Sequence, residues 1–276
     1  MIRRRLRRWL RRVSTVALVL AAIYVAAAYF VLPRVWRHYE HEPGLAGRPM
    51  VTVTASGIPG DPMNVGLVGT KEEAIRALAA AGWYPADPVT LKTSLEIAGS
   101  VIFNRPYRDA PVSPLFYDGR KQDLAFEKPV GESADRRHHV RFWETLQRGE
   151  AGRPVFLGSA TFDRGSGVSH YTGEITHHIA PDIDAERDLL VADLIAARML
   201  TEIFHVTGIG PTLLGRNGGG DPYYTDGEIT VGVVSPSAAP SAAPPVVLPD
   251  PVPVAAKNAI WSSARTLFGA EIEAGQ

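Results

Sequence analysis

The hydrophobic pattern divides the chain into three parts. An apolar run without a charged residue extends over residues 14–32. Over residues 61–235, short alternating or apolar segments are interspersed with segments in which apolar residues recur at every third or fourth position. These two periods are typical of strands and of helices, respectively. From residue 236 the chain is rich in Pro and Ala and follows neither period. We therefore expect an apolar N-terminal helix, one folded domain and an extended tail.

The apolar run is long enough to cross a membrane. As a helix rising 1.5 Å per residue it extends roughly 28 Å, close to the hydrocarbon thickness of a bilayer. Because positively charged flanks stay on the cytoplasmic side, we expect residues 1–13 to be cytoplasmic. Residues 14–32 are then a signal anchor that spans the inner membrane once, and the main domain is extracytoplasmic, in the cell envelope. The flanking cations lie within the first twelve residues: Arg3, Arg4, Arg5, Arg7, Arg8, Arg11 and Arg12.

A cleaved signal peptide is the alternative for this segment. Ala26, Ala27 and Ala28 are small residues of the kind found at cleavage sites. The apolar run, however, continues to Leu32 and exceeds the usual signal-peptide core of about 7–15 residues. We therefore favour an uncleaved anchor.

Within the domain the periodicity predicts an α+β fold with a mainly antiparallel sheet packed by two or three helices. Thr70 and Glu73 form the sequence pattern of a capping box at the start of one helix, and Gly82 is suited to end it at a positive φ. Two further helices are predicted over residues 90–103 and 183–200. Strands are predicted over residues 51–54, 64–68, 115–117, 122–127, 138–144, 154–163, 174–179, 201–207 and 228–234.

The boundaries follow from Pro and Gly content. Residues 33–60 are interpreted as a stalk, and residues 236–276 as a Pro/Ala-rich linker followed by a short amphipathic helix over residues 258–268. Two glycine-rich segments lie inside the domain. The one that contains Ser169 and His170 is interpreted as a hairpin turn, and GRNGGGDPYY, residues 215–224, as a mobile connection.

The composition narrows the possible function classes. Lys and Arg number 29, as do Asp and Glu; without the seven N-terminal arginines, 22 basic residues remain against 29 acidic ones. This mildly acidic outer part lacks the clustered cations that bind nucleic acid, so nucleic acid is excluded as a partner. The chain has no Cys, which excludes disulfides, thiolate nucleophiles and Cys-based zinc sites.

A row of cationic side chains is the first candidate site. Side chains alternate between the faces of a strand, so His138 is expected to face inward while Arg137, His139 and Arg141 share the opposite face. Guanidinium groups beside an imidazole suit a phosphate or carboxylate. These three residues are therefore candidates for anion binding, with His139 as a pH-sensitive donor. The alternative is a solvated strand face neutralised by acidic neighbours: Asp123, Glu127 or Asp163.

A metal site is the second candidate. Two imidazoles and a carboxylate can hold Zn²⁺ or another divalent ion, and His139, His178 and Asp182 are candidate ligands. Their spacing matches no helix-borne zinc motif such as H-E-x-x-H. The alternative for Asp182 and the acidic residues after it is that they satisfy the free amides at a helix N-terminus.

The chain resembles the LssY C-terminal domain family from about Gly60 to about Ile209. The stretches that carry the resemblance are GDPMNVGLVGTKEE, AAGWYPADPVTLKTSL, RPYRDAPVSPLFYDGRKQDLAFEKPVG, RRHHVRFW and THHIAPDIDAERD. Related domains are appended to phosphatase-like and DedA-like membrane segments. The resemblance therefore implies that the domain is associated with membrane proteins. This chain has one predicted anchor and no phosphatase signature, so that catalysis is not carried over.

Three functions are left open by the sequence. The first is a membrane-anchored binding or accessory module that recognises phosphate-bearing lipid or glycan material. The second is a hydrolase of such material, in which His139, His178 and Asp182 hold a metal ion or act as acid and base. The third is a structural partner of another membrane protein, reached through the Pro-rich tail.

Overall fold

The computed structural model describes residues 2–26, 50–86, 92, 115–131, 136–207 and 212–274. The helices are α1 (Ile2–Ala26), α3 (Lys71–Ala80), α5 (Ile183–Ala196) and α6 (Val252–Ala274), with a 3₁₀ turn η3 (Glu150–Gly152). The strands before η3 are β1 (Val51–Thr54), β2 (Pro59–Pro62), β3 (Val65–Val68), β4 (Tyr84–Pro85), β5 (Leu115–Tyr117), β6 (Arg120–Lys121), β7 (Leu124–Pro129) and β8 (Arg137–Arg148). Those after it are β9 (Pro154–Val168), β10 (Ile175–Ile179), β11 (Leu200–Thr207), β12 (Thr212–Arg216), β13 (Pro222–Thr225), β14 (Glu228–Val234) and β15 (Val246–Val247).

Helix α1 combines the arginine segment with most of the apolar run. Within the described residues, this is the one helix that is long and apolar enough to span a membrane, over Arg7–Ala26. Its apolar side chains, among them Leu18, Leu20 and Ile23, are exposed. The predicted span of residues 14–32 is thus helical as far as Ala26, and its remainder lies outside the described residues. Residues 2–13, expected only as a basic segment, belong to the same helix.

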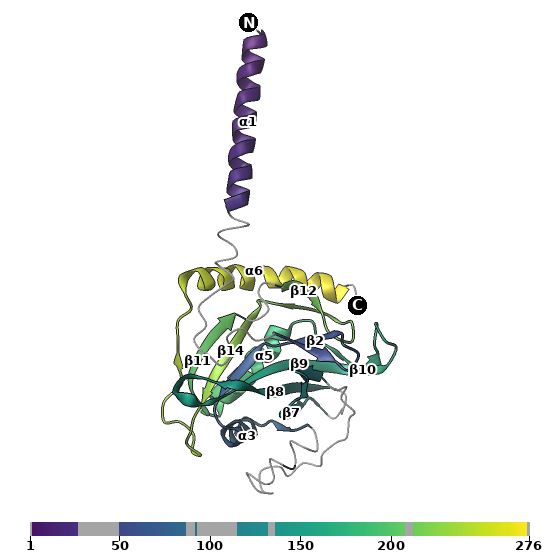
Figure 1. The fold of residues 1–276 in the computed structure, drawn as a ribbon, viewed down its shortest axis with the longest axis vertical. Helices are drawn as coiled ribbons and strands as arrows, with labels where there is room; N and C mark the ends of the chain where they lie inside the picture. The colour runs from purple at the N-terminus through teal and green to yellow at the C-terminus, as the bar shows by residue number, and fades with distance from the viewer. Residues whose placement is uncertain are drawn as a thin grey trace.

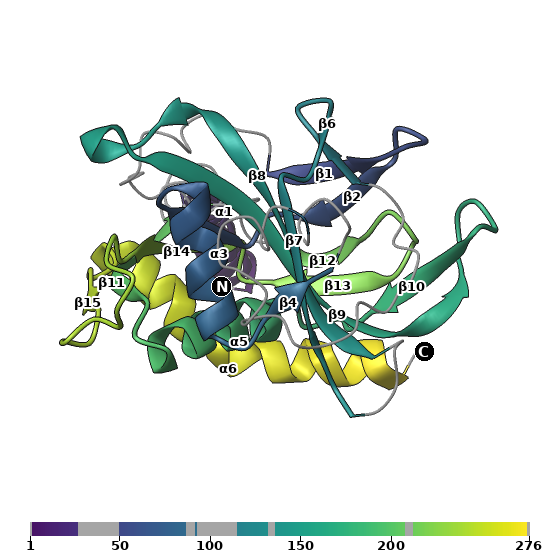
Figure 2. The same ribbon diagram turned by 90° about the horizontal axis from the view of Figure 1, so that it is seen from below.

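A nine-stranded sheet forms the centre of the domain (Figures 1 and 2). Its strand order is β15-β11-β14-β3-β9-β8-β7-β4, and β10 pairs with the far end of β9. Most pairs are antiparallel; β3 with β14 and β11 with β15 are parallel. The predicted α+β class with a mainly antiparallel sheet is confirmed. A four-stranded sheet, β2-β1-β5-β6, and the hairpin β12-β13 complete the strands.

The two faces of the large sheet bury different cores. Helices α3 and α5 cover one face, where Ile75, Leu78 and Leu190 pack against strand residues such as Phe126 and Phe142. On the other face, strand residues Trp143 and Leu157 pack with Leu115 and Tyr117 of the small sheet. Because both faces are covered, β8 is buried on both sides from Arg137 to Trp143, apart from the half-buried His138.

The two helices on the sheet begin as the sequence predicts. Thr70 accepts a hydrogen bond from the Glu73 amide while the Glu73 carboxylate accepts from the Thr70 amide, and Gly82 follows the helix at φ +81°. Helix α5 begins at Ile183, as predicted, but ends at Ala196 instead of residue 200. Arg198 adopts φ +56° and turns the chain into β11. The predicted helix over residues 90–103 lies outside the described residues, except for Lys92.

Three expectations about the boundaries were wrong. The stalk was predicted to extend to residue 60, but its predicted strand 51–54 (β1) and the first half of β2 pair with each other and, through β1, with β5. The supposed mobile segment 215–224 forms a tight turn between β12 and β13. The tail is docked on the domain: α6 is longer than predicted, Val254 and Trp261 are buried, and Lys257 pairs with Glu228.

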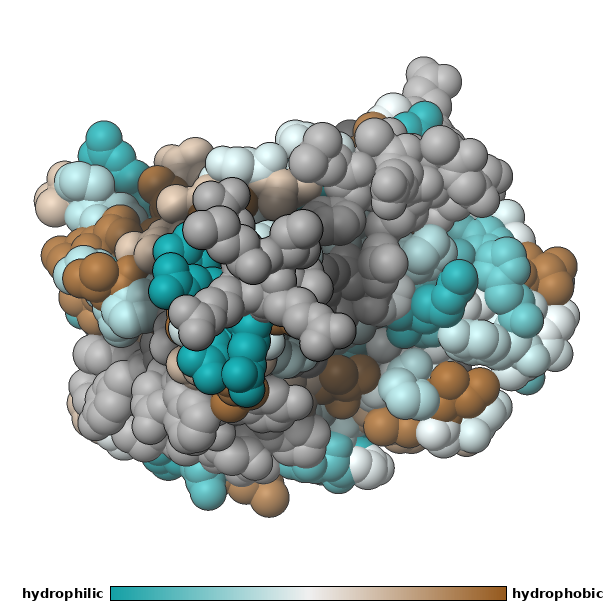
Figure 3. Space-filling model, turned by 90° about the horizontal axis from the view of Figure 1, so that it is seen from above, coloured by the Kyte–Doolittle hydropathy of each residue, from teal (hydrophilic) through white to brown (hydrophobic). Residues whose placement is uncertain are grey.

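Helix α6 lies along one side of the domain (Figure 1). Seen from above, the described surface is mixed, with brown hydrophobic residues lying among teal and white ones (Figure 3). The contact buries Val254, Trp261 and the ion pair between Lys257 and Glu228. Undocking would leave the charge of Glu228 without its lysine. The residues after Val234 therefore belong structurally to the domain.

Candidate functional site

A polar cavity of about 360 Å³ opens on the sheet face opposite α3 and α5. It is bounded by the end of β1, by β2, β8, β9 and β10, and by the turn between β12 and β13. Its charged lining side chains are Asp61, Arg141, Asp163, Glu174 and His177. The hydroxyl and amide lining side chains are Thr54, Ser56, Thr161, Ser169, Thr172, Thr176 and Asn217.

The predicted cationic row does share one strand face, but it is buried instead of solvated. Arg137, His139 and Arg141 are 2, 2 and 6% exposed. Arg137 donates from Nη1 to Glu127 at 2.8 Å and from Nε to Asp163 at 3.1 Å. Arg141 lies 3.6 Å from Asp61 and is the member of the row that lines the cavity. The arginines therefore already face carboxylates.

His139 is enclosed among cations. Burial, then Arg141, Arg137 and His177, hold its pKa well below the usual value. Its Nε2 is buried without a hydrogen-bond partner. A histidine in this setting stays neutral at physiological pH, so the expected role as a pH-sensitive donor to an anion does not fit its surroundings. His138, expected to face inward, is half-buried on the other face, with Nδ1 2.7 Å from Glu186.

Two carboxyl groups of the cavity are shifted toward their protonated forms. Burial raises the pKa of Asp61 to about 6, against the lowering effect of Arg141, and nearby Asp163 raises it further. Burial also raises the pKa of Asp163, opposed by Arg137. A carboxyl group that titrates near neutral pH beside an open cavity is suited to proton transfer.

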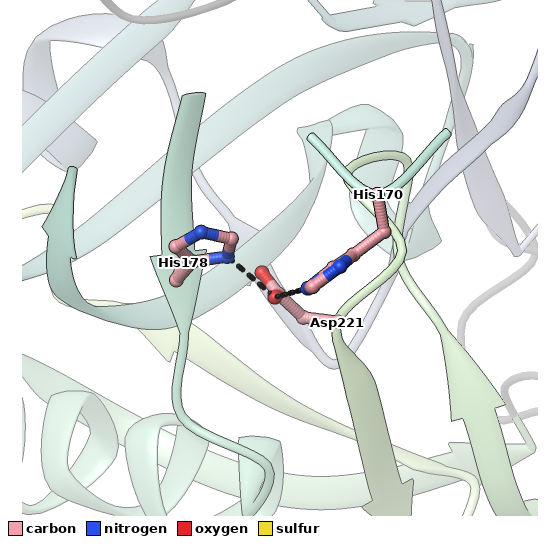
Figure 4. A group of neighbouring side chains, drawn as sticks. All are labelled: His170, His178 and Asp221. Carbon is pink, nitrogen blue, oxygen red and sulfur yellow. Dashed lines mark hydrogen bonds and ion pairs between the residues drawn. The ribbon is translucent and has the colours of Figure 1, made fainter. Parts of the chain in front are cut away.

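A cluster of two histidines and one aspartate lies beside the cavity (Figure 4). His178 is on β10, His170 is in the turn between β9 and β10, and Asp221 directly precedes β13. Nδ1 of His178 lies 2.7 Å from Oδ1 of Asp221, and Nε2 of His170 lies 3.8 Å from the same oxygen. Ser169 and Gly219, which neighbour these residues, line the cavity.

The structure gives the predicted metal ligands other partners. Of His139, His178 and Asp182, His178 alone belongs to a group in reach of one ion; within the described residues that group is His170, His178 and Asp221. Asp182 instead caps α5, where its side chain accepts from the Ala185 amide at 3.1 Å. His139 and His178 lie on different strands, and His178 points away from the cavity that His177 lines.

His170 and Asp221 were assigned to a turn and to a mobile connection, so the sequence reasoning missed their meeting. The sequence feature that could have indicated this contact is the high glycine content of both segments. A Cβ at Gly167 would lie 2.2 Å from Nε2 of His178, and one at Gly220 would lie 2.7 Å from Cβ of His170. These glycines admit the close approach of the two rings, which lie 5.4 Å apart.

Fold and site together define an α+β domain that carries a polar cavity and follows a helix long enough to span a membrane. The sequence model of the family described as LssY C-terminus matches residues 45–229. Since the match covers more than half of the chain, the chain belongs to this family, as its sequence resemblance indicates. No curated protein and no solved structure matches the chain.

Proposed function

We propose that this chain is a membrane-anchored protein of the cell envelope whose extracytoplasmic domain binds hydroxyl-rich, glycan-type material in the polar cavity. The apolar, exposed α1 supports the anchor, and the arginines at its start support a cytoplasmic N-terminus. The single observation that carries the binding function is the cavity of about 360 Å³, which combines many polar and charged side chains with the apolar side chains of Ala55, Leu115 and Ile179. Its size falls within the range of small-molecule sites.

The charge balance of the cavity decides the ligand class. Three carboxyl groups, of Asp61, Asp163 and Glu174, line it against one guanidinium, that of Arg141, and the imidazole of His177. Arg141 already faces Asp61, and Arg137 behind the cavity faces Asp163, so both guanidinium groups have carboxyl partners. Glu174 adds a further carboxyl group, which when ionised accepts hydrogen bonds from hydroxyls and repels a phosphate. Hydroxyls and the Asn217 amide add both donors and acceptors. A neutral polyol therefore fits this lining better than the phosphate group suggested by the arginine row alone.

Calorimetry on the full chain in detergent micelles tests this proposal. The probes are chitobiose and maltose as hydroxyl-rich ligands and inorganic phosphate as the anion. Thr161→Val removes one cavity hydroxyl at nearly constant shape; we expect it to weaken disaccharide binding about tenfold, the scale of one hydrogen bond. The matched control, Thr201→Val on β11, removes a hydroxyl that does not line the cavity. Binding of phosphate alone, or of no probe, overturns the proposal.

A hydrolase of the same material is the second candidate function. The observation that favours it is the position of Asp61 and Asp163 in one cavity, with the pKa of Asp61 raised to about 6. In glycoside hydrolysis one carboxylic acid protonates the leaving oxygen while a second carboxylate activates water or attacks the sugar. In this function Asp61 protonates the leaving oxygen.

A cleavage assay distinguishes the binding function from the hydrolase function. The bound disaccharide is incubated with the full chain, and its products are followed by mass spectrometry. In a hydrolase, Asp61→Asn abolishes cleavage while the disaccharide still binds. Binding by the unaltered chain without any cleavage excludes the hydrolase and leaves the binding module.

A further inference from the structure

We propose that His170, His178 and Asp221 bind a divalent transition-metal ion, with Zn²⁺ the best match. This site does not depend on the function proposed for the cavity. Its three ligand atoms lie within 4.8 Å of one another. In a tetrahedral zinc site with bonds of about 2.0–2.1 Å, neighbouring ligand atoms are about 3.3 Å apart. The cluster reaches that geometry through small shifts of the imidazoles around the Asp221 carboxylate.

The carboxylate is already oriented for this role. Oδ2 of Asp221 accepts from the Ile179 amide at 3.0 Å and from Nδ2 of Asn217 at 3.4 Å. Oδ1 is thereby directed at the two histidines (Figure 4). Asn217 in turn accepts at Oδ1 from the amides of Gly219 and Asp221. Such partners behind a ligand are typical of metal sites, where they fix the orientation of the ligand.

The two histidines differ in solvent exposure, which suits a site that takes up an ion from solvent. The side chain of His178 is 25% exposed, and its ring packs against Gly167. The His170 side chain is 61% exposed, although its amide donates to the Gly219 carbonyl at 2.8 Å and holds the turn in place. One ligand is therefore buried, one half-buried and one exposed, so the site is open to solvent on the side of His170.

The ligand set determines the class of ion. Imidazole nitrogens favour Zn²⁺ and its transition-metal neighbours, whereas Mg²⁺ and Ca²⁺ prefer sites made entirely of oxygen ligands. Three protein ligands leave at least one position for water, which is the arrangement of catalytic and not of structural zinc sites. None of the three ligands lines the cavity, although their chain neighbours Ser169 and Gly219 do.

The test measures metal binding by the full chain in detergent micelles. After treatment with a chelator, the protein is titrated with ZnCl₂ by calorimetry, and with CoCl₂ by visible absorption as a second readout. We expect one equivalent of zinc. His170→Ala is the decisive variant because an exposed side chain is removed without disturbing the fold. We expect it to weaken binding at least about tenfold, since loss of even an outer-shell partner has an effect of that size.

A matched control is another His–Asp pair of the domain. Nδ1 of His205 lies 3.1 Å from Oδ1 of Asp250. Within the described part of the chain, this pair belongs to no group of three residues that could hold a metal ion. His205→Ala should leave zinc binding unchanged, while His178→Ala should abolish it. The proposal is overturned if the folded, unaltered chain binds no zinc, or if His170→Ala and His178→Ala bind it as tightly as the unaltered chain. Disaccharide binding measured in the same samples keeps this outcome distinct from the cavity proposal.

Discussion

Arg137 on β8 and Asp163 on β9 lie directly opposite each other in the sheet, and Nε of the arginine donates to Oδ2 of the aspartate at 3.1 Å. Both side chains are almost fully buried. Buried charges are tolerated only in pairs. The relationship therefore makes Arg137 a structural cation, held behind the cavity by Asp163 and Glu127.

Replacing Arg137 should destabilise the domain strongly. Arg137→Met leaves Glu127 and Asp163 buried without their cation, and we expect a loss of about 3–5 kcal/mol in the free energy of unfolding. The control is Arg148→Met, which removes an exposed partner of Glu144 at 3.7 Å; exposed pairs contribute about 0–1 kcal/mol. Denaturant unfolding in micelles measures both. Equal stability of the two variants contradicts the structural role of Arg137.

Asp61 should make stability fall as the pH rises. Its pKa in the fold is about 6, above the ordinary value of 3.8. Between these two values the folded state binds more protons at this group than the unfolded state. The contribution of Asp61 to stability is therefore fully present below about 3.8 and is lost as the pH rises through about 6. A shift of about two units corresponds to about 3 kcal/mol.

The measurement compares the free energy of unfolding at pH 4.5 and 7 in the unaltered chain and in Asp61→Asn. The variant cannot ionise, so we expect its stability to fall less over this interval. Glu72→Gln on α3, an exposed carboxylate, serves as the control. If Asp61→Asn and the unaltered chain change in parallel, the carboxyl group does not titrate as inferred.

His139 should act in the opposite direction. Because its pKa is lowered in the fold, the unfolded state binds more protons below pH 6.5, and stability is lost as the pH falls through that value. His139→Gln should reduce the loss between pH 7 and 5.5 by about 1 kcal/mol. The same substitution at His205, whose side chain is 30% exposed and which belongs to neither proposed site, provides the comparison. A loss that is unchanged in His139→Gln indicates that the imidazole is protonated in the fold.

The buried contact of α6 predicts that the tail stabilises the domain. Nζ of Lys257 donates to Glu228 and, at 3.0 Å, to the Asp226 carbonyl. Lys257→Met leaves Glu228 buried and unpaired, with an expected loss of about 3–5 kcal/mol. Adding Glu228→Gln should recover most of this loss.

Lys121→Met, at an exposed position on β6, is the control for the Lys257 substitution. Thermal unfolding of all three variants is the measurement. Equal midpoints for Lys257→Met and Lys121→Met would mean that α6 is not held by its lysine. The tail would then be free to reach a partner protein, as the third function considered from the sequence requires.

The sequence predicted local structure better than contacts between distant segments. The capping box of Thr70 and Glu73 was predictable because its hydrogen bonds join neighbours in the chain. The alternation of Arg137, His139 and Arg141 on one face was equally local, but their burial was not, since it depends on which segments cover that face. The meeting of His178 with Asp221 joins a strand to a turn 43 residues away, and no periodicity reports such a contact.

The docking of α6 was missed for a related reason. Pro and Ala content indicates an extended linker, and residues 236–245 contain no helix or strand. The helix that follows is held by Lys257, whose importance depends on Glu228 being buried near its side chain. Composition indicates how a segment behaves on its own. It does not show that a residue of the tail, Lys257, has a buried partner in a strand of the main domain.

The position of β3 in the sheet determines when the sheet can form during synthesis. This strand lies between β9 and β14, both of which are made later. Until β9 and β14 have been synthesised, the four apolar or glycine residues of β3 have both strand edges unpaired. Unpaired strand edges promote aggregation with other chains. The sheet closes only when residues as far as Val234 are available. Because the chain is synthesised from its N-terminus, the domain thus remains vulnerable to aggregation until almost all of it has been made.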